Sequence, residues 1–208
     1  AKSFRDNPLI GSRRLNEAGL HVKRITLAER MADARRRRLA HLVPAEDREA
    51  YARDGFIQKR DLLPEEELAG LRHEIETTPL DAWDMRQGNA VTRFVPLPPQ
   101  VLKDLPYLRR FVWSKPFQNG LRYVASTNGD PLVYLHIVMT DPSGKTRADP
   151  QTAFHSDTFH QTAKSWFFLY DIDDAEGPFT YIAGSHRLTP ERLEWERQQS
   201  LTAATDKN

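Results

Sequence analysis

The run Lys164–Ile172 limits the fold more than any other stretch of the sequence, because it is apolar on both of its alternating faces. In an extended chain its large side chains divide between the two faces, with Trp166, Phe168 and Tyr170 on one and Phe167 and Leu169 on the other. A strand of this kind needs protein cover on both sides. The pattern therefore predicts a central strand of a β sandwich or barrel.

Further strands are predicted on both sides of this run. Stretches rich in β-branched and aromatic residues, bounded by Pro, Gly, Asp or Ser, predict strands at Leu132–Met139, about Thr152–His155 and Phe179–Ile182. Short strands that follow one another without intervening helices favour antiparallel pairing. The chain after Gly129 is thus expected to be an antiparallel β region.

Helices are predicted to flank this region. Thr26, followed three residues later by Glu29, has the pattern of a capping box and predicts a helix over about 27–42. Proline at a first helical turn predicts three more helices, at about 44–53, 64–77 and 190–199. Gly55 stands where a left-handed residue would end the second of these four helices. Several prolines predict loops and short helical turns between Pro79 and Asn128.

The charge of the chain is concentrated at its N-terminus. Residues 1–43 contain eleven Lys or Arg against four Asp or Glu, although the whole chain has a formal net charge of only +1. We expect a basic, partly helical extension at 1–43, dispensable for chemistry, and a main domain at 44–208. Arg35–Arg38 lacks the interleaved aromatic residues that stack bases. A solvated helix face is therefore favoured, and nucleic acid is not an expected partner.

Composition argues against thiolate metal sites, membrane-spanning proteins and secreted proteins. The chain has no cysteine, so any metal must be held by imidazole, carboxylate or water. No apolar run is long enough to span a bilayer, and residues 1–7 lack the order of a secretory signal. We therefore expect a cytoplasmic protein with no membrane partner, while the pattern indicates no particular oligomeric state.

The triplet His155-Ser156-Asp157 is the strongest candidate for chemistry. Its first and third residues project to the same side of an extended segment, so an imidazole and a carboxylate can close on one divalent metal ion. Two ligands do not make a site, and the triplet alone is a weak motif. The neighbouring sequence is needed to distinguish a metal site from a triplet that occurs by chance.

The neighbouring sequence resembles the phytanoyl-CoA dioxygenase family. The stretches that carry the resemblance are FHSDTFH and AKSWFFLYDIDDAEGPFTYIAGSHR, with a weaker match earlier in the chain at YARDGFIQKRDLLPEEELAGL. The resemblance covers roughly Tyr51–Arg187 and is specific in combination. Ala183 stands where the family usually has proline, a difference that affects a turn and leaves the metal ligands untouched.

The resemblance implies a mainly β fold with flanking helices, the double-stranded β-helix (jelly-roll, cupin-like), which here lacks its C-terminal strands. It also implies Fe(II) held by His155, Asp157 and a distal histidine, with 2-oxoglutarate as cosubstrate and O₂ as oxidant, in an enzyme that hydroxylates an unidentified small molecule. The carboxylate of Asp157 argues against halogenation. Thr152 and His136 are candidate contacts of 2-oxoglutarate; the alternatives are an ordinary strand threonine and a hydrogen-bonded core histidine.

The sequence departs from the family pattern in one place. No histidine follows His186, whereas the resemblance implies a distal histidine and, soon after it, an arginine for 2-oxoglutarate. Either both lie outside these residues or the protein is a degenerate homologue. His186 could be the third ligand, but in the resembling family this histidine belongs to a structural turn. His160 is too close to Asp157 in the chain to complete a facial set, and a loop position or a substrate contact is favoured for it. The alternative to an oxygenase is a catalytically inactive β-helix homologue that acts as a binding or scaffold protein.

Overall fold

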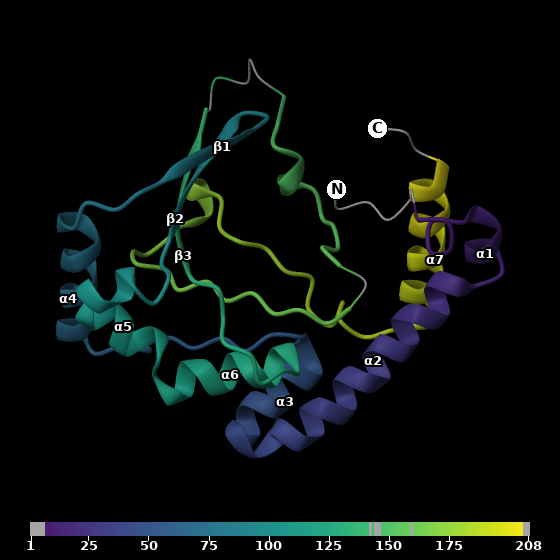
Figure 1. The fold of residues 1–208 in the computed structure, drawn as a ribbon, viewed down its shortest axis with the longest axis horizontal. Helices are drawn as coiled ribbons and strands as arrows, with labels where there is room; N and C mark the ends of the chain where they lie inside the picture. The colour runs from purple at the N-terminus through teal and green to yellow at the C-terminus, as the bar shows by residue number, and fades with distance from the viewer. Residues whose placement is uncertain (1–6, 142, 144–146, 159, 206–208) are drawn as a thin grey trace.

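The computed structural model describes residues 7–141, 143, 147–158 and 160–205. At its centre lies a three-stranded antiparallel sheet of order β1-β2-β3, with β1 at Trp83–Gln87, β2 at Ala90–Pro96 and β3 at Tyr134–Thr140 (Figure 1). A two-residue turn with Gly88 at φ +54° connects β1 to β2. β3 lies on the other side of β2, with Ala90 opposite Thr140. The sheet therefore consists of a hairpin extended by one later strand.

The main hydrophobic core lies between this sheet and the helices α4 (Glu65–Thr77) and α5 (Pro106–Val112). Leu71 of α4 and Leu105, just before α5, are fully buried there. Glu74 accepts hydrogen bonds from the backbone N–H groups of Tyr107 and Leu108 at 2.8 and 3.0 Å. It thereby satisfies free donors in the first turn of α5 and ties the two helices together. The 3₁₀ helix η2 (Val101–Asp104) precedes α5.

The remaining helices form the lower and right-hand sides of the molecule in Figure 1. They are α1 (Arg13–Glu17), α2 (Leu20–Leu39) with the 3₁₀ turn η1 (Ala40–Leu42), α3 (Ala45–Asp54), α6 (Lys115–Ala125) and α7 (Pro190–Thr205). α1 and α2 pack against α7, and α2 also packs against α6. The described part of the basic N-terminal region is therefore in contact with the rest of the fold. None of the helices in the described ranges is long and apolar enough to cross a bilayer.

The helices at 44–53 and 64–77 are confirmed by α3 and α4, and the helix at 190–199 is confirmed as the first part of the longer α7. Gly55 has the expected left-handed conformation, with φ +88°. The helix expected over about 27–42 is confirmed by α2 and η1, but α2 begins earlier, at Leu20. The capping-box prediction is therefore wrong, because Thr26 lies inside the helix. The Thr26 hydroxyl donates to the carbonyl oxygen of Val22 at 2.8 Å, a bond that a threonine inside a helix can make.

The arginine run is partly solvated, as predicted. Arg35, Arg37 and Arg38 are exposed, but the interpretation is wrong for Arg36, which is buried. The Arg36 guanidinium lies 4.6 Å from the centre of the Tyr51 ring and pairs with Asp33 at 2.6 Å. Both contacts compensate for the loss of water around this charge.

The strand predictions are confirmed only in part. β3 confirms the strand at Leu132–Met139, whereas β1 and β2 occupy a region assigned to loops and helical turns. Thr152–His155, Lys164–Ile172 and Phe179–Ile182 form no strands in the described structure. The described part of 153–189 is instead irregular apart from the 3₁₀ turn η4 (Asp174–Glu176), and in Figure 1 it is the green-to-yellow segment between the sheet and α7.

The physical reason lies in strand pairing. A strand exists only where its backbone groups meet those of a neighbour, and alternation of side chains alone does not supply that neighbour. Phe167 and Leu169 do pack against the main core, while Trp166 and Phe168 are 45% and 49% exposed. The prediction that protein covers both faces of Lys164–Ile172 is therefore wrong. The flanking helices are confirmed. Of the antiparallel β region expected after Gly129, only β3 is present among the described residues, and it completes one small antiparallel sheet whose other two strands, β1 and β2, lie earlier in the chain.

Candidate functional site

The His155-Ser156-Asp157 triplet, called the 155–157 turn below, lies in the irregular segment after the 3₁₀ helix η3 (Pro150–Thr152). His155 Nε2 lies 3.5 Å from Asp157 Oδ1, and the two side chains are 43% and 40% exposed. His155 Nδ1 lies 2.7 Å from the carbonyl oxygen of Ala153. Because a carbonyl can only accept, Nδ1 carries a hydrogen, so Nε2 is the nitrogen that a neutral imidazole would offer to a metal ion. The structure thus brings the two candidate ligands together with the imidazole oriented as a ligand.

Lys164 places a positive charge beside this pair. Its ammonium forms an ion pair with Asp157 Oδ2, so that Oδ1 is the carboxylate oxygen facing His155. Lys164 also acts on His136: loss of water around the imidazole lowers the pKa of His136, and the positive charge of Lys164 lowers it further. A divalent cation at His155 and Asp157 would have to compete with this ammonium for the carboxylate.

His136 lies on β3, with its ring centre 4.4 Å from that of Phe94. It is exposed, so the interpretation as a core histidine is wrong. Thr152 lies in η3, so its interpretation as an ordinary strand threonine is also wrong. Its hydroxyl donates to the carbonyl oxygen of Asp149 at 2.7 Å, and the hydroxyl oxygen can still accept a hydrogen bond.

His186 has a structural position. Its ring centre lies 5.3 Å from that of Tyr51 in α3, and burial, followed by the charge of Arg187, lowers the pKa of His186. A Cβ atom on Gly55 would lie 2.4 Å from His186 Nδ1. Gly184 N–H donates to the carbonyl oxygen of Asp54 at 2.7 Å. The Asp-Gly-Phe and Gly-Ser-His-Arg motifs, far apart in sequence, are therefore packed against each other, and only glycine fits at position 55.

Arg192 of α7 connects the two motif turns. Its Nη2 donates to Ser156 Oγ at 3.3 Å, and its Nη1 donates to the carbonyl oxygen of Ser185 at 2.8 Å. Sequence reasoning missed this residue, because an arginine four residues before Glu196 on a polar helix looks like an ordinary surface pair. Only the fold brings it to Ser156.

The two candidate ligands fit part of an iron site. One imidazole nitrogen and one carboxylate oxygen are donors that suit Fe(II), Mn(II) and similar metals. Among the residues that the structure describes, no group of three or more His, Asp or Glu is placed to hold a metal ion. The described residues therefore bring the two candidate ligands together without a third group beside them.

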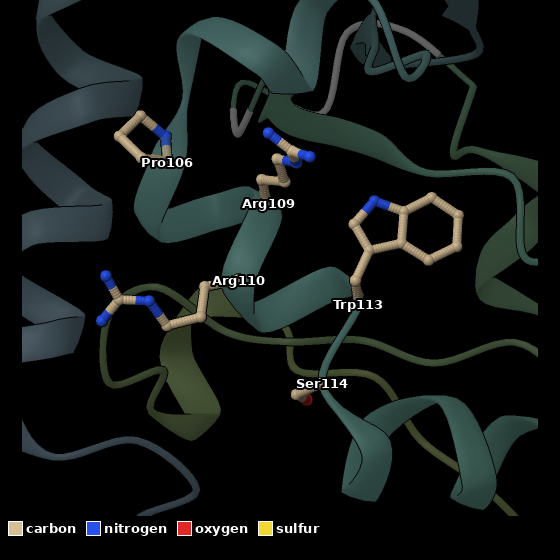
Figure 2. Close-up of a pocket in the computed structure, with 5 residues that line it drawn as sticks. All are labelled: Pro106, Arg109, Arg110, Trp113 and Ser114. Carbon is tan, nitrogen blue, oxygen red and sulfur yellow. The ribbon is translucent and has the colours of Figure 1, made fainter.

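Two surface hollows of the described structure lie away from His155 and Asp157. One surface hollow of about 690 Å³ is formed by α5 and the connection from α5 to α6, as Figure 2 shows, and is lined by Pro106, Arg109, Arg110, Trp113 and Ser114. A second, of about 480 Å³, is lined in part by Gln161, Thr162 and Ala163, which closely follow the 155–157 turn. Neither hollow is lined by His155 or Asp157.

Comparison with known proteins gives one match. The profile of the phytanoyl-CoA dioxygenase family matches residues 51–208, which include the C-terminal end of α3, the 155–157 turn and the turn at 184–187. No curated protein matches the chain, and no solved structure does. The match covers well over half of the 208 residues and contains both motif turns that the fold holds together through Arg192. The chain belongs to the phytanoyl-CoA dioxygenase family.

Proposed function

We propose that this protein is an Fe(II)- and 2-oxoglutarate-dependent dioxygenase that hydroxylates a small molecule. The observation that carries the proposal is the facing pair of His155 Nε2 and Asp157 Oδ1, 3.5 Å apart, in a chain that belongs to a family of such oxygenases. A ferrous ion with 2-oxoglutarate supplies the oxidising power for hydroxylation of a C–H bond by O₂.

His155 and Asp157 are the proposed metal ligands. The hydrogen bond from His155 Nδ1 to Ala153 keeps the imidazole in the tautomer that binds through Nε2. Thr152 and His136 are the proposed contacts of 2-oxoglutarate, with a hydroxyl and an imidazole as hydrogen-bonding groups. Lys164 balances the charge of Asp157 until a cation takes its place.

We also propose that the complete domain has the double-stranded β-helix of its family and that residues 44–208 belong to it. The family match beginning at Tyr51 supports this boundary. Further support comes from β3, which is an edge strand without charged residues and with most of its side chains exposed. An apolar edge of this kind suits a strand that pairs further in the complete domain.

The experiment measures succinate formed from 2-oxoglutarate with Fe(II), ascorbate and air, using the 208-residue chain with and without added imidazole. We expect little succinate without imidazole, because no third ligand stands beside the two proposed ones among the described residues. Imidazole can occupy the third nitrogen position and should raise succinate formation. His155→Ala should form none under either condition, which separates the site from free iron.

Two results would change the account. Robust succinate without imidazole that is abolished by His186→Ala would make His186 the third ligand. No succinate under any condition, together with no Fe(II) binding, would favour the second candidate, an inactive homologue that binds a ligand or partner. One observation favours that second candidate: the ion pair with Lys164 already satisfies Asp157 Oδ2 without a metal.

A further inference from the structure

A continuous series of polar contacts joins the N-terminal region to the 155–157 turn. His21 Nε2 of α2 lies 3.0 Å from Glu196 Oε2 of α7. The other carboxylate oxygen, Oε1, accepts a hydrogen bond from Arg192 Nη2 at 2.7 Å. The same guanidinium reaches Ser156 Oγ at 3.3 Å and the carbonyl oxygen of Ser185 at 2.8 Å. Four side chains thus link a helix of residues 1–43 to the residue between the two proposed metal ligands.

The inner part of this series is buried. The side chains of His21 and Glu196 are 5% and 9% exposed, and that of Arg192 is 26% exposed. Burial raises the pKa of Glu196, but the hydrogen bonds from His21 and Arg192 outweigh it and lower that pKa overall. Glu196 therefore stays ionised and fixes the orientation of the Arg192 guanidinium. A buried carboxylate that lost one of these partners would be costly.

The 155–157 turn needs such an anchor. It is exposed and belongs to no helix or strand, so no regular hydrogen-bond pattern orders its two ligands before a metal binds. Ligands that are free to move must lose conformational entropy on binding, which weakens the affinity. Arg192 holds the residue between them and, through Ser185, holds the turn at 184–187 as well.

We propose that Arg192 is a positioning residue for the metal ligands and that Glu196 and His21 fix Arg192 in place. This inference rests on the proposed function, since the order of the turn matters for catalysis only if the turn binds metal. It replaces the expectation that residues 1–43 are dispensable for chemistry. His21 lies in that region, so removing the region would leave Glu196 without one of its two buried partners.

The test compares Arg192→Ala, Arg192→Lys and His21→Gln with a matched control, Arg197→Ala. Arg197 lies on the same helix and pairs with Glu194 at 2.9 Å, with side chains 34% and 55% exposed. Mn(II) affinity is measured by calorimetry under anaerobic conditions. We expect Arg192→Ala to weaken Mn(II) binding about tenfold, as loss of a residue that orients metal ligands commonly does. His21→Gln should weaken it less, Arg192→Lys should recover part of the loss, and Arg197→Ala should not change it.

A second measurement needs no metal. The ring ¹H–¹³C signal of His155, assigned with His155→Gln, should shift in metal-free Arg192→Ala and stay in place in Arg197→Ala. Equal Mn(II) affinity in the Arg192→Ala and Arg197→Ala chains, with an unmoved His155 signal, would overturn the inference and leave the proposed function standing. Absence of Mn(II) binding by the unsubstituted chain would overturn the proposed function, and the catalytic meaning of the inference with it.

Discussion

Gly55→Ala tests the packing between the two family motifs. Gly55 ends α3 at φ +88°, and the left-handed region costs a residue with a Cβ about 1–2 kcal/mol. The new methyl group would also stand 2.4 Å from His186 Nδ1 and 2.7 Å from the Tyr181 hydroxyl. Overpacking of this kind typically costs about 1–3 kcal/mol more. We therefore expect the free energy of unfolding to fall by about 2–5 kcal/mol.

The matched control is Gly19→Ala. Gly19 also has φ +88°, but a Cβ atom there would meet nothing within 4 Å. This variant should lose only the backbone part, about 1–2 kcal/mol. Urea unfolding followed by circular dichroism measures both variants, with the slope of the transition checked for constancy. Equal losses in the two variants would refute the close packing of Gly55 against the turn at 184–187.

Two further predictions concern charges near the site. Lys164→Gln should tighten Mn(II) binding, measured by calorimetry, at most about fivefold. The reason is that an exposed ion pair that competes for Asp157 is worth up to about 1 kcal/mol. Weaker Mn(II) binding in this variant would show that Lys164 assists the metal. The pKa of Glu196 is lowered from 4.5 in the folded chain, so its contribution to stability is present above about pH 4.5 and is lost as the pH falls through the lowered value. Glu196→Gln should therefore flatten the acid side of the stability curve measured by urea unfolding, and an unchanged curve would contradict this.

Local signals predicted the helices better than the strands. Pro64 and Pro190 mark helix starts through chemistry that operates within one turn, and α4 and α7 begin beside them. Lys164–Ile172 shows the limit of such signals: alternation predicted that Phe167 and Leu169 would share a face, and both pack on the core. Alternation could not supply a partner strand, because pairing depends on backbone from elsewhere in the chain.

The β1–β2 hairpin was not predicted, although the sequence contains a pattern that indicates it. Gly88-Asn89 separates two short runs that form β1 and β2, and a two-residue turn of this composition is typical of a hairpin. Neighbouring prolines, such as Pro96 and Pro98, favoured loops instead. Pro96 ends β2 and therefore interrupts no central part of the sheet.

In the candidate site, too, contacts between residues close in sequence were predictable and contacts that depend on the fold were not. The spacing of His155 and Asp157 is local, and the predicted approach of the two side chains is present at 3.5 Å. Arg192 is separated from Ser156 by 36 positions, and nothing in its own neighbourhood points to that contact. Lys164 is only seven positions from Asp157, but its place beside the carboxylate follows from the irregular path of the chain.

The most direct test is anaerobic calorimetric titration of Fe(II) into the unsubstituted chain and into His155→Ala, Asp157→Ala and His160→Ala. His160 is an exposed histidine of the same segment and serves as the control. Loss of either facing donor should weaken Fe(II) binding about tenfold or more, because only one of the two proposed ligands remains. His160→Ala should bind as the unsubstituted chain does. Unchanged affinity in both His155→Ala and Asp157→Ala would contradict the account.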